Sequence, residues 1–293
     1  MPKNLLFHLD TDPFPSVFDT VVAYDGGADH VKGYGGVNPD NVKPLIEGTI
    51  FTRPPKDKKH TAIFVSGSNM VAGEELFKAA QTHFFGDFRV SIMLDSNGSN
   101  TTAAAMVALL EHASDNLKGK RAVVLAGTGP VGMRAGVMLA QEGCDVVLTS
   151  RNLERAAQAC EDMKTSFGVE MKPAEVKDEE SLKEALVGAQ IVLACGAAGV
   201  ELLPYEIWKD NPTIQMMSDA NATPPLGFGG IDMMDKGKLY HGKLVFGAIG
   251  VGTLKLALHK RCIQELFKAH DQIFDAPEIY TLCKEIIAEN GGW

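Results

Sequence analysis

The sequence lacks the features that mark membrane, secreted and nucleic-acid-binding proteins. No apolar run approaches the roughly 20 residues that cross a bilayer. The opening segment MPKNLLFHLDTDP reaches aspartates where the apolar part of a secretion signal would continue. Acidic residues outnumber basic ones, 37 to 28, and the net charge of −9 offers no excess of positive charge to a polyanion. We therefore expect a soluble, cytoplasmic protein with neither a membrane nor a nucleic acid as partner.

Cysteine is scarce and follows no pattern. The five cysteines are odd in number and widely spaced, with no C-x-x-C pair, which argues against a zinc ribbon and a disulfide framework. No other residues show metal-ligand spacing, so we expect no metal site. The hydrophobic share of 45% and the charged share of 22% are those of an ordinary globular protein, and 293 residues suffice for two domains.

Short β-rich runs alternate with helical stretches, which predicts an α/β fold with parallel sheets. In the first part we predict strands at 4–9, 61–66 and 88–94, helices at 16–24, 69–85 and 100–112, and a helix starting at 38–40. A polar, glycine-containing segment at 115–120 predicts a boundary between domains. The second part predicts strands at 121–126, 145–149, 169–176, 190–194, 214–218 and 244–248, and helices at 131–142, 153–167, 178–186, 254–269 and 277–289. We predict an N-terminal α/β domain at 1–117 and a Rossmann domain at 118–276, with helix 277–289 packed on either.

The most specific motif is the glycine pattern in VVLAGTGPVG at 123–132, which follows an apolar strand and opens a helix. Gly127 permits a tight turn, Gly129 lets the backbone approach a pyrophosphate, and Gly132 lets the helix pack against the strand. The free N–H groups of the helix start then face the phosphates. The predicted dinucleotide-binding residues here are Gly127, Thr128, Gly129, Pro130, Val131 and Gly132.

The end of the next strand distinguishes NADP from NAD. An NAD enzyme places Asp or Glu about 20 residues past the glycines, whereas this chain has Ser150 and Arg151. Arg151 offers a planar fork of donors to a 2′-phosphate, and Arg155 adds a second positive charge one turn later. We therefore predict NADP as the cofactor. Later strand ends add cofactor candidates at Cys195, Gly196 and Asn221.

Several stretches of the chain resemble NADP-dependent methylene-tetrahydromethanopterin/methylene-tetrahydrofolate dehydrogenases of methylotrophic bacteria. The resemblance covers nearly the whole chain and rests on DTD at 10–12, SVFD at 16–19, YDGGADH at 24–30, LDSNGSNTTAAA at 94–105, AGTGPVGMR at 126–134, PPLG at 224–227, GGID at 229–232 and KL at 255–256. It implies oxidation of the methylene bridge of a reduced pterin to a methenyl group in one-carbon metabolism, with hydride transfer to NADP. It also implies a groove between the domains and a homo-oligomer, a trimer or a dimer of trimers.

Removing a hydride from a methylene bridge leaves a delocalised cation and no proton to abstract, so no general base is obligatory. The resemblance places a substrate-facing lysine at Lys255, which interrupts an apolar run after a glycine-rich turn. Without the resemblance, a lysine on an exposed helix side is an equally good reading. The remaining substrate-binding candidates are Asp19, Tyr24, Asn97, Thr101, Thr102, Asp219 and Asn221, each of which also suits a helix cap or a structural hydrogen bond.

Related bifunctional folate enzymes carry Tyr-x-x-x-Lys, with the lysine serving a hydrolytic step. Here Ala28 stands four residues after Tyr24, so we expect no second, hydrolytic activity.

Two alternatives remain at this point. One is an NADP oxidoreductase of shikimate-dehydrogenase type, which needs a lysine–aspartate pair in the first domain. The lysines near that region are Lys56, Lys58 and Lys59. They lie in a run of charged residues that we expect to be exposed to solvent. The other is a non-enzymatic module that senses NADP. The sequence leaves open the choice between tetrahydrofolate and tetrahydromethanopterin.

Overall fold

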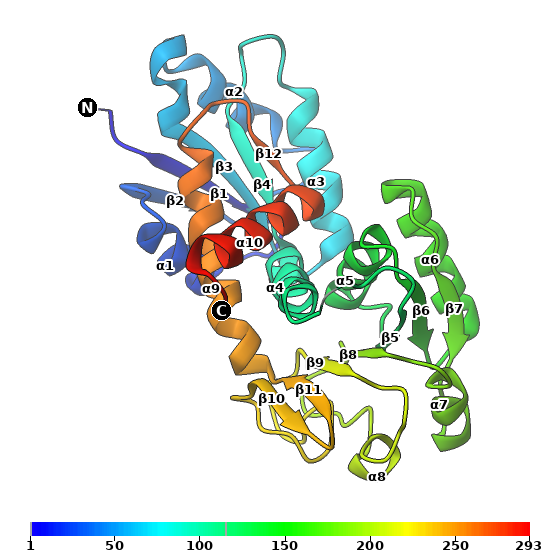
Figure 1. The fold of residues 1–293 in the computed structure, drawn as a ribbon. Coiled ribbons are helices and arrows are strands. Elements are labelled where there is room, and N and C mark those ends of the chain that lie inside the picture. Colours follow the sequence, from blue (N-terminus) through cyan, green and yellow to red (C-terminus); the bar gives the residue numbers. More distant parts are fainter. Residues whose placement is uncertain (1, 115) are drawn as a thin grey trace. The chain divides into compact units, whose positions relative to one another are not determined.

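A computed structural model describes residues 2–114 and 116–293, so one position of the predicted boundary segment 115–120 lies outside the described residues (Figure 1). The chain forms two compact units. The first runs up to Thr101 and resumes at Leu256–Leu282, and the second comprises Thr102–Lys255 and Cys283–Trp293. The predicted limits were 117 and 276. The return of the chain to the first unit at Leu256–Leu282 includes a late strand that joins the first sheet.

The first unit holds a parallel sheet in the order β12-β4-β3-β1-β2. Its strands are β1 (Leu5–Asp10), β2 (His30–Tyr34), β3 (Thr61–Ser66), β4 (Ser91–Leu94) and β12 (Ile273–Phe274). Its helices are α1 (Val17–Asp25), α2 (Lys43–Phe51), α3 (Met70–Thr82) and two short 3-10 turns, η1 (Pro55–His60) and η2 (Ser96–Gly98). Three further helices are divided between the units: α4 (Ser99–His112), α9 (Ala248–Leu266) and α10 (Ala276–Asn290).

Alternate residues of the central strands pack on opposite faces of this sheet. Leu9, Ile63 and Val65 join the apolar core with residues of α2 and α3, whereas Phe64 stacks on His8 from the same face of the neighbouring strand, with ring centroids 5.0 Å apart. The strand order reverses between β1 and β3. In open α/β sheets such a point marks the crevice where ligands bind, at the carboxyl ends of the strands.

The helix predicted to start at 38–40 is wrong: these residues form a turn, and α2 begins at Lys43 with a proline in its first turn. Asn38 instead caps the turn locally, its carboxamide oxygen accepting the Asp40 N–H at 3.0 Å. Strand β2 escaped prediction because HVKGY carries little apolar signal, and pairing with β1 forms it. The predicted helix at 16–24 corresponds to α1, where the Ser16 side chain accepts the Asp19 N–H as an N-cap.

The second unit holds a seven-stranded sheet in the order β10-β11-β9-β8-β5-β6-β7. Its strands are β5 (Arg121–Leu125), β6 (Asp145–Ser150), β7 (Lys172–Glu175), β8 (Ile191–Ala194), β9 (Met216–Asp219), β10 (Lys236–Tyr240) and β11 (Lys243–Phe246). Its own helices are α5 (Pro130–Gln141), α6 (Leu153–Phe167), α7 (Glu179–Ala185) and α8 (Tyr205–Trp208). The strand order reverses between β5 and β8, which is the Rossmann switch point.

Local signals set most boundaries of this unit. Helix α6 has the predicted limits, since Asn152 caps its first turn and Gly168 ends it in a left-handed conformation. Strand β10 escaped prediction. It pairs antiparallel to β11 through a turn in which His241 and Gly242 both have positive φ. No helix of the described residues is long and apolar enough to cross a membrane.

Candidate functional site

The glycine-rich turn after β5 is closely packed at two glycines and open at the third. A Cβ on Gly132 would lie 2.6 Å from the Gly127 backbone, and one on Gly127 would lie 2.5 Å from the Leu148 side chain. A Cβ on Gly129 would meet no atom closer than 3.8 Å. Gly127 and Gly132 thus let strand and helix touch, while Gly129 faces free space.

The turn is strained at a residue that the motif does not mark. Ala126 has a φ of 50°, in the left-handed region that favours glycine. Its N–H donates to the Thr149 hydroxyl at 3.2 Å, and that hydroxyl donates to the Val124 carbonyl at 3.1 Å. The end of β6 therefore holds the turn in place. Strain of this kind concentrates at ligand-binding turns.

Helix α5 starts directly after the turn, with Gly129 as its N-cap and Pro130 in its first turn. Pro130 has no N–H, and the N–H groups of Val131 and Gly132 have no acceptor within the helix because they lie in its first turn. Together with the helix dipole they form a site suited to an anionic group.

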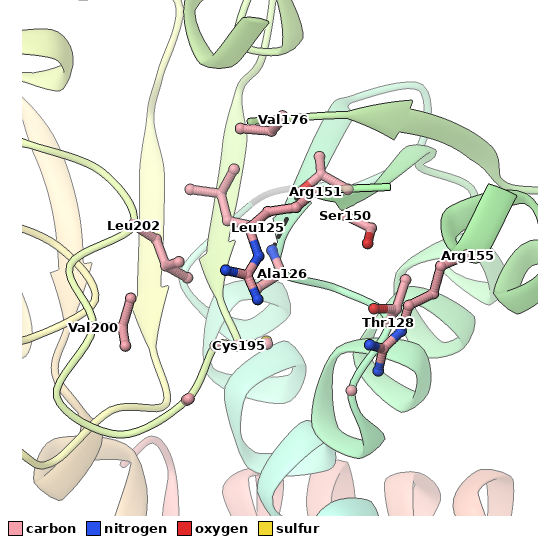
Figure 2. A pocket seen from close by; sticks show the side chains of 14 residues that line it. Leu125, Ala126, Thr128, Ser150, Arg151, Arg155, Val176, Cys195, Val200 and Leu202 are labelled. Carbon is pink, nitrogen blue, oxygen red and sulfur yellow. Dashed lines mark hydrogen bonds between the residues drawn. The ribbon is translucent and has the colours of Figure 1, made fainter. Parts of the chain in front are cut away.

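A cavity of about 350 Å³ opens at the carboxyl ends of β5, β6 and β8 (Figure 2). Seven of the predicted cofactor residues line it: Thr128, Gly129, Ser150, Arg151, Arg155, Cys195 and Gly196. Gly127, Pro130, Val131, Gly132 and Asn221 are absent from its lining. The remaining lining residues are Leu125, Ala126, Thr149, Val176, Ala197, Val200 and Leu202, which were not predicted. Only their position at or beyond the carboxyl ends of the strands could have indicated them.

Two arginines supply the charge of this cavity. Figure 2 shows the Arg151 side chain reaching across the turn toward Ala126, and the Arg155 guanidinium near Thr128. Both residues are exposed, and neither guanidinium has a hydrogen bond or ion pair within residues 2–114 and 116–293. Ser150, at the end of β6, accepts the Asn152 N–H at 3.3 Å and keeps its hydroxyl proton available. The cavity therefore presents unpaired positive charge, which suits a phosphate group.

The apolar wall of the cavity faces these arginines. Val200 and Leu202 lie on the side opposite Arg155 in Figure 2, and Val176 lies beyond the end of β7. A cavity with one apolar wall and one cationic wall fits an adenine ring and its phosphates. The residues present therefore fit a dinucleotide cofactor.

Cys195 follows β8, Asp219 is the last residue of the neighbouring β9, and both are buried. Burial raises the pKa of the Cys195 thiol far above its usual range, with a further contribution from Asp219, so this thiol is no nucleophile at neutral pH. The Asp219 carboxylate accepts the N–H groups of Asn221 at 2.8 Å and Phe228 at 3.1 Å. Burial nevertheless raises its pKa to about 6, against the opposing effect of these hydrogen bonds.

The Asn221 side chain is used in organising its own loop. Its carboxamide oxygen accepts the Thr223 N–H at 2.9 Å and the Gly199 N–H at 3.3 Å, and its nitrogen donates to the Pro225 carbonyl at 2.9 Å. Asn221 was predicted to bind both cofactor and substrate. In the structure it ties the loop after β9 to the loop after β8.

In the first unit, a buried polar network fixes the carboxyl ends of β1 and β3. Ser66 donates its hydroxyl proton to Asp10 at 2.9 Å, so the 2.5 Å contact between Ser66 and His8 Nε2 has the imidazole as donor. Burial lowers the pKa of His8 despite the nearby Asp10, which keeps the ring neutral with its proton on Nε2. Asp10 also accepts the Asp12 N–H at 2.8 Å and the Ser16 N–H at 3.0 Å. Sequence patterning did not predict this network.

Four substrate candidates belong to the first unit. Asp19 lies in the first turn of α1. The Tyr24 hydroxyl accepts the Val31 N–H of β2 at 3.4 Å. Asn97 is exposed and has a left-handed backbone, with a φ of 56°. Thr101 is fully buried, and its hydroxyl donates to Asp95 at 2.6 Å. Asp95 also accepts the Asn100 and Thr101 N–H groups at the start of α4, so the Thr101 hydroxyl helps to hold the carboxylate that caps this helix.

The other substrate candidates belong to the second unit. Thr102 is partly buried on α4, and Lys255 is partly buried on α9. The predicted substrate residues are thus divided between the two units. Their joint use by one substrate stays a prediction.

One reading of the first unit changes with the structure. Lys58 is 2% exposed, contrary to its expected place in a solvated run: its ammonium donates to the Asp87 carbonyl at 2.7 Å and lies 4.1 Å from the Phe88 ring centre. Ala28 lies beyond the end of α1, so Tyr24 and Ala28 do not share a helix. Among the described residues, no group of His, Cys, Asp and Glu has a metal-binding arrangement.

Comparisons with known proteins agree with this geometry. A family model described as "Methylene-tetrahydromethanopterin dehydrogenase, N-terminal" matches residues 17–97. A Methylorubrum extorquens protein named "Bifunctional protein MdtA" is 56% identical over 287 residues, covering 98% of this chain and 100% of that protein. A second protein of that organism, named "NAD(P)-dependent methylenetetrahydromethanopterin dehydrogenase", is 33% identical over 296 residues, covering 98% and 99%.

Among solved structures, a shikimate 5-dehydrogenase from Listeria monocytogenes, in complex with shikimate and NAD, is similar over 97% of this chain and 96% of its own. The TM-score is 0.51 and the identity 13%, so the likeness concerns the fold alone. It confirms the predicted α/β fold with a Rossmann-type sheet.

Proposed function

Because the chain belongs to the methylene-tetrahydromethanopterin dehydrogenase family, we propose that it oxidises the methylene bridge of a reduced pterin to a methenyl group, using NADP. The chain is a dehydrogenase of this family, as predicted. The shikimate-type and NADP-sensing alternatives are set aside, since both relatives match this chain from end to end. The pterin carrier is tetrahydromethanopterin, tetrahydrofolate or both.

The observation that carries the cofactor proposal is the pair of unpaired arginines beside an open glycine turn. Arg151 would bind the 2′-phosphate through two parallel N–H donors, and Arg155 would add positive charge on the same side. Gly129 and the first N–H groups of α5 would hold the pyrophosphate. NADP, when bound, accepts a hydride from the methylene carbon.

The residues of the chain then act by positioning and charge. A methylene bridge that loses a hydride leaves a cation delocalised over its two nitrogens, and no proton has to be removed. Lys255 would hold a carbonyl or carboxylate oxygen of the pterin by a charge-assisted hydrogen bond. Asp19, Tyr24, Asn97 and Thr102 would supply further polar contacts.

The test follows the methenyl and NADPH absorbance bands together, with methylene-tetrahydromethanopterin or methylene-tetrahydrofolate as substrate and with NADP or NAD offered separately. The proposal expects both bands to rise in equal molar amounts with NADP and far more slowly with NAD. NADP binding without turnover of either pterin would contradict the substrate assignment. Equal rates with both cofactors would contradict the role given to Arg151.

The remaining features of the proposal come from the family resemblance. We propose a cytoplasmic homo-oligomer, a trimer or a dimer of trimers. The mass in solution tests this proposal directly.

A further inference from the structure

The neighbouring strands β1 and β3 end beside one buried carboxylate, that of Asp10, which is 1% exposed (Figure 1). Its Oδ1 accepts the Asp12 N–H at 2.8 Å. Its Oδ2 accepts the Ser16 N–H at 3.0 Å and the Ser66 hydroxyl at 2.9 Å, and lies 3.4 Å from His8 Nε2. Each oxygen of Asp10 therefore holds one backbone N–H of the loop between β1 and α1.

The first segment held in this way is the start of α1. Ser16, whose N–H donates to Asp10, is the N-cap of that helix, and its side chain accepts the Asp19 N–H at 3.2 Å. Asp19 is a proposed pterin contact and lies two hydrogen bonds from Asp10. Because the cap fixes the backbone of the first turn, a displacement of Ser16 moves Asp19 with it.

The loops after β3 and β4 are joined to the same carboxylate. Ser66 donates to Asp10, and the carbonyl of the next residue, Gly67, accepts the Asn97 N–H at 2.7 Å. Gly67 has a φ of 129°, and a Cβ there would overlap the Thr11 hydroxyl, so the loops after β1 and β3 are in direct contact. Asn97 is a second proposed pterin contact. Its backbone is therefore held by the loop that Ser66 anchors.

This network specifies a position more than it adds stability. A buried carboxylate loses its hydration, and its hydrogen bonds only offset that cost. One nitrogen of the His8 ring, Nδ1, is buried with no hydrogen-bond partner among residues 2–114 and 116–293, which adds a second cost. Apolar side chains at these positions would avoid both costs. A carboxylate with both oxygens satisfied instead holds its donors in one arrangement.

We infer that Asp10 is a positioning residue of the pterin site, which holds Asp19 and Asn97 in the relative positions that a reduced pterin requires. The inference rests on the proposed function, because that function assigns Asp19 and Asn97 to the pterin. Asp10 is buried, so it acts through the loops that it anchors and not by contact with the substrate. Loss of the network should weaken pterin binding and leave the cofactor cavity of the second unit unchanged.

The variant Asp10→Asn breaks the network at nearly constant shape. In either orientation of the new carboxamide, its NH₂ group meets a backbone N–H, that of Asp12 or that of Ser16, as donor against donor. Hydrogen exchange followed by mass spectrometry, without any ligand, reports this geometry. We expect exchange at 11–20 and 95–98 to rise at least about tenfold, while 55–60, before β3, exchanges as in the parent. Unchanged exchange at 11–20 and 95–98 would overturn the inference.

Pterin binding separates positioning from a general loss of stability. Lys58→Met is the matched control, since Lys58 is also buried but precedes β3, at the opposite end of that strand from Ser66. Both variants are assayed well below their melting temperatures. We expect Asp10→Asn to raise the Kd for tetrahydromethanopterin or tetrahydrofolate, and the KM for the methylene form, about 10- to 100-fold. The KM for NADP should stay within about twofold, and Lys58→Met should change none of the three by more than about twofold.

A second variant covers the case in which Asp10→Asn does not fold. Ser66→Ala removes one hydroxyl and leaves both backbone N–H donors of Asp10, so it should raise the same pterin constants about threefold or more. A parent protein that binds neither reduced pterin contradicts the proposed function, and the inference with it. A parent that binds a pterin, with equal binding by the folded network variants or an equal loss in Lys58→Met, overturns the inference alone.

Discussion

Arg151 offers the sharpest test of the cofactor site. Its guanidinium lines the cavity at the end of β6 and has no partner among the described residues, so replacing it leaves no broken ion pair behind. The variant Arg151→Gln leaves a shorter polar side chain and removes the charge and the planar fork. Any loss therefore reports what the arginine gives to the bound cofactor.

The magnitude follows from the chemistry of the contact. A hydrogen bond to a charged group contributes about 1.5–3 kcal/mol, and about 1.4 kcal/mol is a factor of ten. We expect kcat/KM for NADP to fall roughly 10- to 150-fold, while kcat/KM for NAD, which has no 2′-phosphate, changes by less than about twofold. Arg155→Gln removes a more distant, screened charge worth about 0.3–1 kcal/mol, so its two- to fivefold defect should shrink as salt rises.

The assay compares initial rates with NADP and NAD at saturating methylene pterin. Lys164→Gln serves as the control, because it removes one positive charge from the far end of α6, where Lys164 is paired with Glu170 at 2.8 Å. If Arg151→Gln lowers kcat/KM equally for NADP and NAD, or for neither, the assignment of Arg151 to the 2′-phosphate is refuted. If Lys164→Gln shows the same defect, the effect is one of overall charge.

Three further predictions concern the glycine turn, a buried carboxyl and the substrate lysine. Gly132→Ala forces a methyl against backbone 2.6 Å away and should lower the unfolding free energy by about 1–3 kcal/mol, whereas Gly129→Ala should keep the melting temperature and raise the KM for NADP. Asp219 has a folded-state pKa near 6, above its unfolded value, so the folded protein holds its proton more tightly than the unfolded chain does. The free energy of unfolding therefore decreases as the pH rises from about 4 to about 6. Urea unfolding at a series of pH values should show this loss, about 3 kcal/mol, in the parent protein and not in Asp219→Asn. Parallel pH profiles for the two proteins would contradict the prediction. Lys255→Met should lower kcat/KM for the pterin about 10- to 100-fold with NADP affinity unchanged, while Lys260→Met, on the same helix, stays within about twofold; equal effects would remove Lys255 from the site.

Local sequence signals predicted most elements of the Rossmann unit. Its glycines, caps and alternating strands act within a few residues of one another, so each predicts its own element without knowledge of the rest. The cap at Asn152 is of this kind, as are the caps at Ser16 and Asn69 in the first unit. The predicted preference for NADP also came from a local signal, because the residue at the end of β6 lies at a fixed distance from the turn.

The tertiary structure decided what depends on distant partners. Strand β12 forms because Ile273 and Phe274, late in the chain, pair with β4. The part of α9 from Leu256 onward belongs to the first unit with it. Lys58 is buried because its ammonium donates to the Asp87 carbonyl and lies over the Phe88 ring, 29 and 30 positions later in the chain. The network of His8, Ser66 and Asp10 joins residues up to 58 positions apart. No local pattern encodes such pairings.

The sequence by itself determined that a parallel α/β unit binds a phosphate-bearing dinucleotide, because turn, helix start and strand end lie within about 30 residues. Only the tertiary structure decided which side of α1 faces outward. Val22 and Ala23 pack inward while Val17, Val21 and Tyr24 stay exposed. The helix itself is predicted by its N-cap and composition, but both of its faces carry apolar residues. Packing against the rest of the first unit therefore selected the buried face and left the other exposed.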